Sequence, residues 1–181
     1  MQDTVVLPNP TDQDVLELMR IHSLSGMPEF ISFSDAGYPP RFCHVAAKHA
    51  AMTNSGKRVH GRAFWRFVHD YGDGRVSEVL VAEHHSVLEI AGTLVDVTPP
   101  AHDPNRILFL RDDSANIVSI NGTNMMRTDL TNIEEARFLF RGEPIDVSQL
   151  AMPEDIRSGA ETYAAQIGFR MSDYPTDALH G

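Results

Sequence analysis

Apolar and polar residues alternate along residues 57–70, so that every second side chain falls on the same face of an extended chain. A period of two is typical of a β-strand. The apolar positions are Val59, Ala63, Trp65 and Phe67, and the intervening polar positions are Arg58, His60, Arg62 and Arg66. We therefore predict a half-buried strand whose basic face is solvated.

A second apolar stretch, residues 78–98, has the density of β-branched and aliphatic residues that strands favour. Ala91 and Gly92 interrupt it with a tight turn, and two prolines end it because proline cannot donate to a strand ladder. The segment 70–74 is a turn signal between the two stretches. The pattern predicts an antiparallel meander whose last two strands form a hairpin.

Two segments that precede these strands have helical features. Residues 12–25 carry apolar side chains at helical spacing, after Thr11, which can cap a helix, and before Gly26. The Ala-rich segment that begins at Cys43 follows a proline-rich approach and closes at Gly56. We predict two helices, with Cys43 in the first turn of the second, and a short strand or irregular loop between them.

The remainder of the chain predicts further strands and helices. Residues 107–113 and 116–120 favour strands, and the sequence T-N-I-E at 131–134 is a capping box that predicts a helix as far as Gly142. A proline in the first turn favours a last helix over 153–168.

We interpret residues 1–181 as a single α+β domain, in which a helical part carrying Cys43 packs on an antiparallel sheet. Residues 1–10 contain two prolines and are expected to form a loose N-terminal arm. Residues 171–181 are expected to form a polar tail.

Charge and composition argue against several classes of protein. The formal net charge of -10 opposes binding to nucleic acid, although Lys57, Arg58, Arg62 and Arg66 allow a local basic patch. A single cysteine excludes an intramolecular disulfide. Because no apolar run has the length of a membrane span and the N-terminus lacks a secretory pattern, we expect no membrane association and a cytoplasmic location, with signal-less export as the alternative.

Three residues have the types and order of a nucleophilic site. Cys43 lies at a helix N-terminus, where unpaired N–H groups and the helix dipole stabilise a thiolate. His85 and Asp96 lie on neighbouring strands of the hairpin, where polar groups cost free energy unless they are paired or form a site. Neighbouring strand residues face opposite ways, so His84 and His85 cannot both reach Cys43, and we select His85. A histidine can accept the thiol proton while an aspartate orients its ring.

The segments RFCHVAA, HHSVLEI and LVDVTP, which carry these three residues, resemble the papain-like superfamily of cysteine enzymes, and most nearly its transglutaminase-like branch. The D-V-T-P sequence looks like the aspartate-proline-threonine turn of that branch. The resemblance implies a papain/transglutaminase-like fold, with a catalytic helix packed on an antiparallel β-sheet. It also implies hydrolysis, deamidation or acyl transfer on a peptide, a protein side chain or a small amide, through an acyl-thioester and without a cofactor.

The second donor to a developing oxyanion is not evident in the sequence. Papain-like enzymes often use a glutamine shortly before the cysteine, but residues 28–42 contain no glutamine or asparagine. The candidates for this donor or for substrate contacts are Tyr38, His44, Glu83 and Trp65.

Two other interpretations remain open. Cys43 and His44, with His84 or His85 and with His102 as a further candidate, have the atoms of a zinc site, although adjacent pairs are not the usual ligand spacing. The acidic chain could also be a noncatalytic interaction module for a basic partner. Each of the three triad residues, taken alone, also fits an ordinary structural role.

Overall fold

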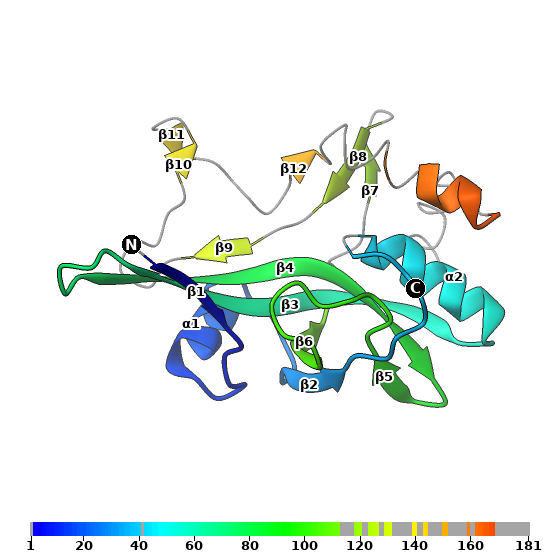
Figure 1. The fold of residues 1–181 in the computed structure, drawn as a ribbon, viewed down its shortest axis with the longest axis horizontal. Helices are drawn as coiled ribbons and strands as arrows, with labels where there is room; N and C mark the ends of the chain where they lie inside the picture. The colour runs from blue at the N-terminus through cyan, green and yellow to red at the C-terminus, as the bar shows by residue number, and fades with distance from the viewer. Residues whose placement is uncertain are drawn as a thin grey trace.

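The computed structural model describes residues 2–40 and 42–112, and beyond them the segments 118–120, 123–126, 129–131, 139–140, 143–144, 150–151, 159 and 162–168. Its architecture is mixed α+β, with helices packed on an antiparallel sheet (Figure 1). Two helices lie in the N-terminal third of the chain: α1, Gln13–Ile21, and α2, Cys43–Thr53.

The main sheet has seven strands, and all of its pairings are antiparallel. These strands are β1 Gln2–Val6, β2 Glu29–Ser32, β3 Lys57–Asp70, β4 Val76–Ile90, β5 Thr93–Val95, β6 Arg106–Arg111 and β9 Asp129–Thr131. The order along the sheet is β2-β6-β3-β4-β5, with β1 also paired to β3 and β9 to β4. The β3–β4 hairpin is thus the centre of the sheet.

Two small sheets account for the remaining strands. One sheet has the order β12-β8-β7, and the other pairs β10 with β11. Their bounds are β7 Val118–Ile120, β8 Thr123–Met126, β10 Leu139–Phe140, β11 Glu143–Pro144 and β12 Leu150–Ala151.

One bridge joins the two ends of the main strand path. Phe33, directly after β2, forms a parallel bridge with Asp96, directly after β5. The Asp96 N–H donates to the Ser32 carbonyl over 3.0 Å, and the Ser34 N–H donates to the Asp96 carbonyl over 2.8 Å. Since β2 and β5 are the ends of the path, this bridge closes the strands into a ring.

One face of these strands forms an apolar core inside the ring. Alternation and register place its side chains on the same face as His85 and Asp96. The buried members of this inner core are Ile31, Val59, Ala63, Trp65, Val87, Ile107 and Phe109.

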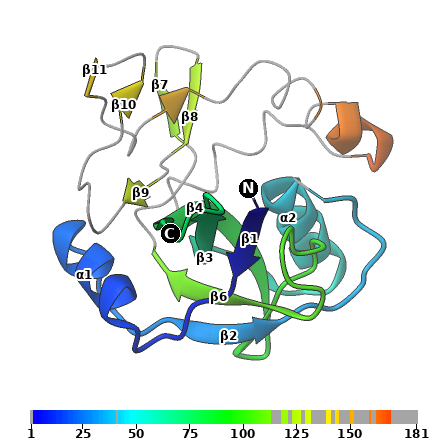
Figure 2. The ribbon, with the colours of Figure 1, turned by 60° about the vertical axis from the view of Figure 1, so that its left-hand side comes forward.

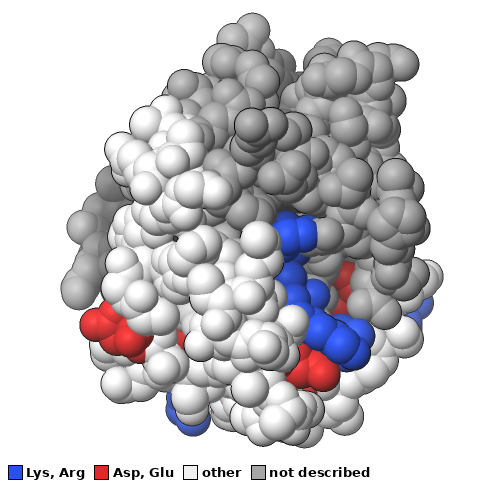
Figure 3. Space-filling view, turned by 90° about the vertical axis from the view of Figure 1, so that its right-hand side faces the viewer, with Lys and Arg blue, Asp and Glu red and all other residues white. Residues whose placement is uncertain are grey.

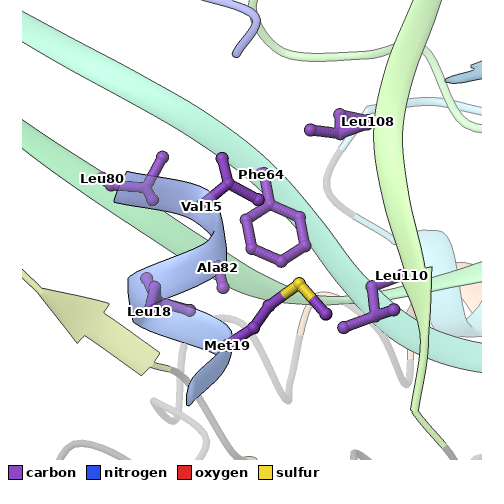
Figure 4. Close-up of a cluster of buried hydrophobic side chains, with 8 residues drawn as sticks. All are labelled: Val15, Leu18, Met19, Phe64, Leu80, Ala82, Leu108 and Leu110. Atoms are coloured by element: carbon purple, nitrogen blue, oxygen red, sulfur yellow. The ribbon is translucent and has the colours of Figure 1, made fainter. Parts of the chain in front are cut away.

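Both helices pack on the opposite, outer face of the sheet. Three buried residues of α1 point toward side chains of β3, β4 and β6, as Figure 4 shows for Val15, Leu18 and Met19. Alanines of α2 pack farther along β4, against Leu88. Figures 1 and 2 accordingly show α1 and α2 toward opposite ends of the β3–β4 hairpin. Burial of these apolar surfaces holds the helices in place.

Several sequence predictions are confirmed. Residues 57–70 form one strand, and the hairpin turns at Ala91 and Gly92. Both turn residues have positive φ, 50° and 81°, as the tight turn of a two-residue hairpin requires. Cys43 is the first residue of α2.

Other sequence predictions are wrong. The expected loose arm of residues 1–10 contains β1, which pairs with the end of β3, because the prolines lie beyond that strand. The first helix begins at Gln13 and ends at Ile21, before the expected limit at Gly26. Residues 139–140 form a strand where the capping box predicted a helix. Residues 132–138 and the expected tail at 171–181 lie outside the described residues.

The basic face of β3 is not solvated, because the helices cover it. Arg62 is 1% exposed, and its Nε donates to Asp112 Oδ2 over 3.1 Å. The Nη2 of Arg66 lies 2.6 Å from Asp14 Oδ2 and 2.9 Å from Asp12 Oδ2, both at the start of α1. Arg62 and Arg66 therefore pair with acidic side chains.

Gly61 supplies a test of the ring. It lies opposite His85 in the register, and an added Cβ would overlap the Leu110 carbonyl oxygen and the Phe109 ring. We expect Gly61→Ala to lower the free energy of unfolding by about 3 kcal/mol or more, the upper range for overpacking, because backbone cannot move aside. Urea denaturation would measure the change.

Gly92→Ala is the matched control. Its Cβ would meet no atom within 4 Å, but its φ of 81° is strained for alanine, at a cost of about 1–2 kcal/mol. If Gly61→Ala lost less unfolding free energy than Gly92→Ala, the close approach of Phe109 and Leu110 to Gly61 would be wrong.

Candidate active site

Asp96 is the most firmly fixed residue of the candidate site. Its backbone closes the ring, and its side chain is 0% exposed. The Thr98 N–H donates to Asp96 Oδ1 over 3.0 Å. One carboxylate oxygen is thereby held by the backbone, and the other, Oδ2, faces His85.

His85 projects from the same inner face and contacts Asp96. Its Nε2 lies 3.1 Å from Asp96 Oδ2, and its side chain is 15% exposed. The edge of the His85 ring faces Phe109, with ring centroids 6.4 Å apart. Because Asp96 occupies Nε2, the nitrogen left to face another partner is Nδ1.

Cys43, the first residue of α2, lies near enough to act on the charge of His85. Burial alone would lower the pKa of His85, but the charges of Asp96 and Cys43, together with a hydrogen bond to each, raise this pKa well above its ordinary value. The structure therefore brings together the three residues that the sequence selected, with His85 in contact with both others.

The start of α2 lies beside the middle of β4. His44 Nδ1 lies 2.6 Å from Ser86 Oγ, which places the first helical turn next to Ser86. Cys43 and His44 thus contact consecutive strand residues, His85 and Ser86, whose side chains lie on opposite faces. This stretch of β4 lies between the segment that pairs with β9 and the segment that pairs with β5.

The helix start also supplies positive potential. The first N–H groups of a helix have no partner within it, and Phe42 at the N-cap provides no side-chain hydrogen bond. The Arg58 guanidinium is near enough for the Cys43 charge to affect it: burial lowers the pKa of Arg58 to about 10, and Cys43 acts in the opposite direction. Sequence reasoning missed this role because it placed Arg58 on a solvated strand face.

The four candidates for oxyanion or substrate contacts have different surroundings. The Tyr38 hydroxyl lies 2.7 Å from His49 Nδ1, and the His44 ring is occupied with Ser86. Trp65, a candidate for oxyanion or substrate contacts, is 2% exposed and belongs to the inner core. Glu83 is half-buried on the inner face, two residues from His85.

The residues considered for zinc are divided between the two faces of β4. His44 and His84 lie with His60 on the outer face, where one potential ligand atom from each histidine lies within 4.8 Å of those of the others. Cys43 and His85 instead contact each other. His102 lies elsewhere, with its ring edge-on to Trp65 at 5.0 Å between centroids.

The surface near α2 carries a band of basic side chains (Figure 3). Acidic side chains border this band, so a local basic area exists on an acidic chain. Arg62, at 1% exposed, does not contribute to this surface.

None of the helices in the described segments combines the length and apolar character that crossing a bilayer would require. Comparisons of the chain with protein-family models, with curated proteins and with solved structures found no match.

Asp96→Asn would test the electrostatics of the site. An amide cannot stabilise the imidazolium by charge, so we expect the pKa of His85 to fall, as measured by NMR titration of the ring. The variant should lose about 1.5–3 kcal/mol of unfolding free energy at acid pH, the range for a hydrogen bond to a charged group.

The pH dependence of this loss has a definite sign. A histidine whose pKa is raised by folding contributes its stability fully below the unfolded value of about 6.5 and loses it as pH rises through the folded value. The stability difference between wild type and Asp96→Asn should therefore shrink in that window. Asp73→Asn in the exposed turn is the control, and an unchanged His85 pKa in Asp96→Asn would contradict the proposed pairing.

Proposed function

We propose that this chain is a cysteine-dependent enzyme that acts on an amide or related acyl bond. The observation that carries the proposal is that His85 contacts Cys43 and Asp96 together, within a partly buried site. A histidine that meets only a structural need would not require both a thiol and a buried carboxylate. The combination has the parts of an activated nucleophile: a thiol, a base and a group that orients the base.

The arrangement of elements supports a papain/transglutaminase-like fold as the finer interpretation. A helix begins at the cysteine, and the next strands of the sheet carry the histidine and then the aspartate. Because His85 Nε2 faces Asp96, we assign Nδ1 to Cys43 in the proposed reaction.

The reaction that we propose has two halves. His85 takes the thiol proton, and Cys43 Sγ attacks the carbonyl carbon, so that a C–S bond forms. The C–N bond then breaks, and the leaving amine takes the proton from His85, which leaves an acyl-thioester. Water or an amine next attacks the thioester and gives its proton to His85. The C–S bond breaks, and that proton returns to the sulfur.

Each neighbouring group has a distinct part in these steps. Asp96 keeps the His85 ring oriented and stabilises its charged form. The Cys43 N–H, at the helix N-terminus, is placed to donate to the oxyanion that forms on the carbonyl oxygen. Arg58 adds positive charge near the sulfur. Peptides, protein side chains and small amides all carry the required bond, and they differ in the nucleophile that resolves the thioester.

Covalent labelling tests the proposal without a known substrate. We expect iodoacetamide to alkylate Cys43 in the native protein at slightly acid pH, where a free cysteine with a pKa of about 8.5 reacts slowly. His85→Gln should slow this labelling by about 100-fold or more, the lower range for loss of an acid–base group. Peptide mass mapping over time gives the rate at Cys43.

Acyl transfer itself can be measured with an activated acyl ester. Wild type should form an acyl-thioester at Cys43 and then release the acyl group to water or to an added amine, whereas His85→Gln should do neither at a comparable rate. His69→Gln, at the far end of β3, is the matched control. Labelling of Cys43 at the same rate in wild type and His85→Gln would reject the enzyme and favour a noncatalytic module.

A further inference from the structure

We propose that His44, His60 and His84 form a binding site for a divalent transition-metal ion, with zinc as the best fit. The three histidines come from three elements: α2, β3 and β4. One nitrogen from each lies within 4.8 Å of those of the other two, and each residue is 8% exposed. The site lies on the outer face of β4, opposite the face that carries His85, and does not depend on the proposed enzyme activity.

His84 is the observation that points to a ligand. Both of its ring nitrogens are buried and have no hydrogen-bond partner in the described part of the chain. A neutral imidazole has one donor and one acceptor, and leaving both unsatisfied in a buried place costs free energy. The His84 ring also lies close to His44, with centroids 4.4 Å apart. A bound ion would be coordinated by the acceptor nitrogen. This coordination would offset part of the free-energy cost of burying the His84 ring without a hydrogen-bond partner.

Ser86 determines which nitrogens of the other two rings can face the ion. Its Oγ lies 2.6 Å from His44 Nδ1 and 2.9 Å from His60 Nδ1. One hydroxyl oxygen can accept from both N–H groups, and in that arrangement Nδ1 is the protonated nitrogen and Nε2 the metal-binding nitrogen of each ring. A hydrogen bond from the other ring nitrogen is the usual support of a histidine ligand.

The electrostatics of the cluster keep its rings in the form that binds metals. Burial, followed by neighbouring charges, lowers the pKa of His44 and His84 well below the ordinary value and that of His60 to about 3. Neutral imidazole is the ligand form. The nearby positive charges are those of Lys48, Arg58 and Arg62, and Arg62 is offset by its ion pair with Asp112.

The geometry requires a modest contraction. Zinc–nitrogen bonds of about 2.0 Å in a tetrahedral site place ligand nitrogens about 3.3 Å apart. Ligand nitrogens that lie within 4.8 Å of one another would have to move closer to reach that separation, and the fourth position would remain for water or another ligand. Because His44 follows Cys43, a bound ion would also fasten the start of α2 to the β3–β4 hairpin.

Metal titration of the full chain tests the site. Protein freed of metal with a chelator would be titrated with zinc by calorimetry and with cobalt by visible absorption. We expect one equivalent to bind, to give the spectrum of a tetrahedral nitrogen site without a thiolate charge-transfer band, and to raise the Tm by linkage. Loss of a residue that hydrogen-bonds to a metal ligand usually weakens metal binding by about 10- to 100-fold, and we expect this effect for Ser86→Ala. His84→Gln removes a ligand itself and should weaken zinc binding by about 100-fold or more.

Three further variants, Cys43→Ala, His69→Gln and His60→Gln, identify the ligands of the ion. Cys43→Ala and the control His69→Gln, at the far end of β3, should bind as wild type does. Loss of metal binding in Cys43→Ala, or a thiolate charge-transfer band in the cobalt spectrum of wild type, would contradict the three-histidine ligand set. Either result would place the ion at Cys43, the proposed nucleophile. The proposed site would be wrong if zinc still bound to both His84→Gln and His60→Gln. It would also be wrong if folded wild type did not bind zinc. Circular dichroism of each metal-free variant separates loss of binding from loss of fold.

Discussion

The bridge between Phe33 and Asp96 is the contact on which the rest of the structure depends. It joins the two ends of the strand path and so encloses the inner core. The same backbone hydrogen bonds fix Asp96, whose carboxylate then fixes His85. A buried carboxylate is costly unless it is well paired, and the Thr98 N–H and the His85 ring both meet that need. Fold closure and the candidate chemistry therefore rest on one residue.

The alternation of β4 separates two kinds of histidine that are adjacent in the sequence. His85 faces a carboxylate and a thiol, which raise its pKa and favour the charged ring. His84 faces other histidines in a buried place, which lowers its pKa and favours the neutral ring. A charged ring suits proton transfer beside a nucleophile, whereas a neutral ring suits a metal ion. One strand can hold both chemistries because neighbouring side chains never share a face.

Local sequence patterns predicted the strands that carry the site. They could not predict pairings between residues that are far apart in the sequence. The period of two in β3 and the positive-φ turn at Gly92 depend on nearby residues, and both were predicted correctly. The partner of β1 is distant along the chain, and so are the carboxylates that pair with Arg66. Likewise, the triad could be selected by residue type and strand face, but His60 was missed because its partners come from other elements.

The position of the proposed nucleophile depends on the packing of α2 as a whole. The helix contacts the sheet through alanines, chiefly Ala46 and Ala50, whose small side chains let the helix lie close to β4. At its first turn, Cys43 meets His85 on one face while His44 meets Ser86 on the other. The helix start is thus held from both sides of the strand. A change that shifts α2 would therefore move Cys43 and His44 together.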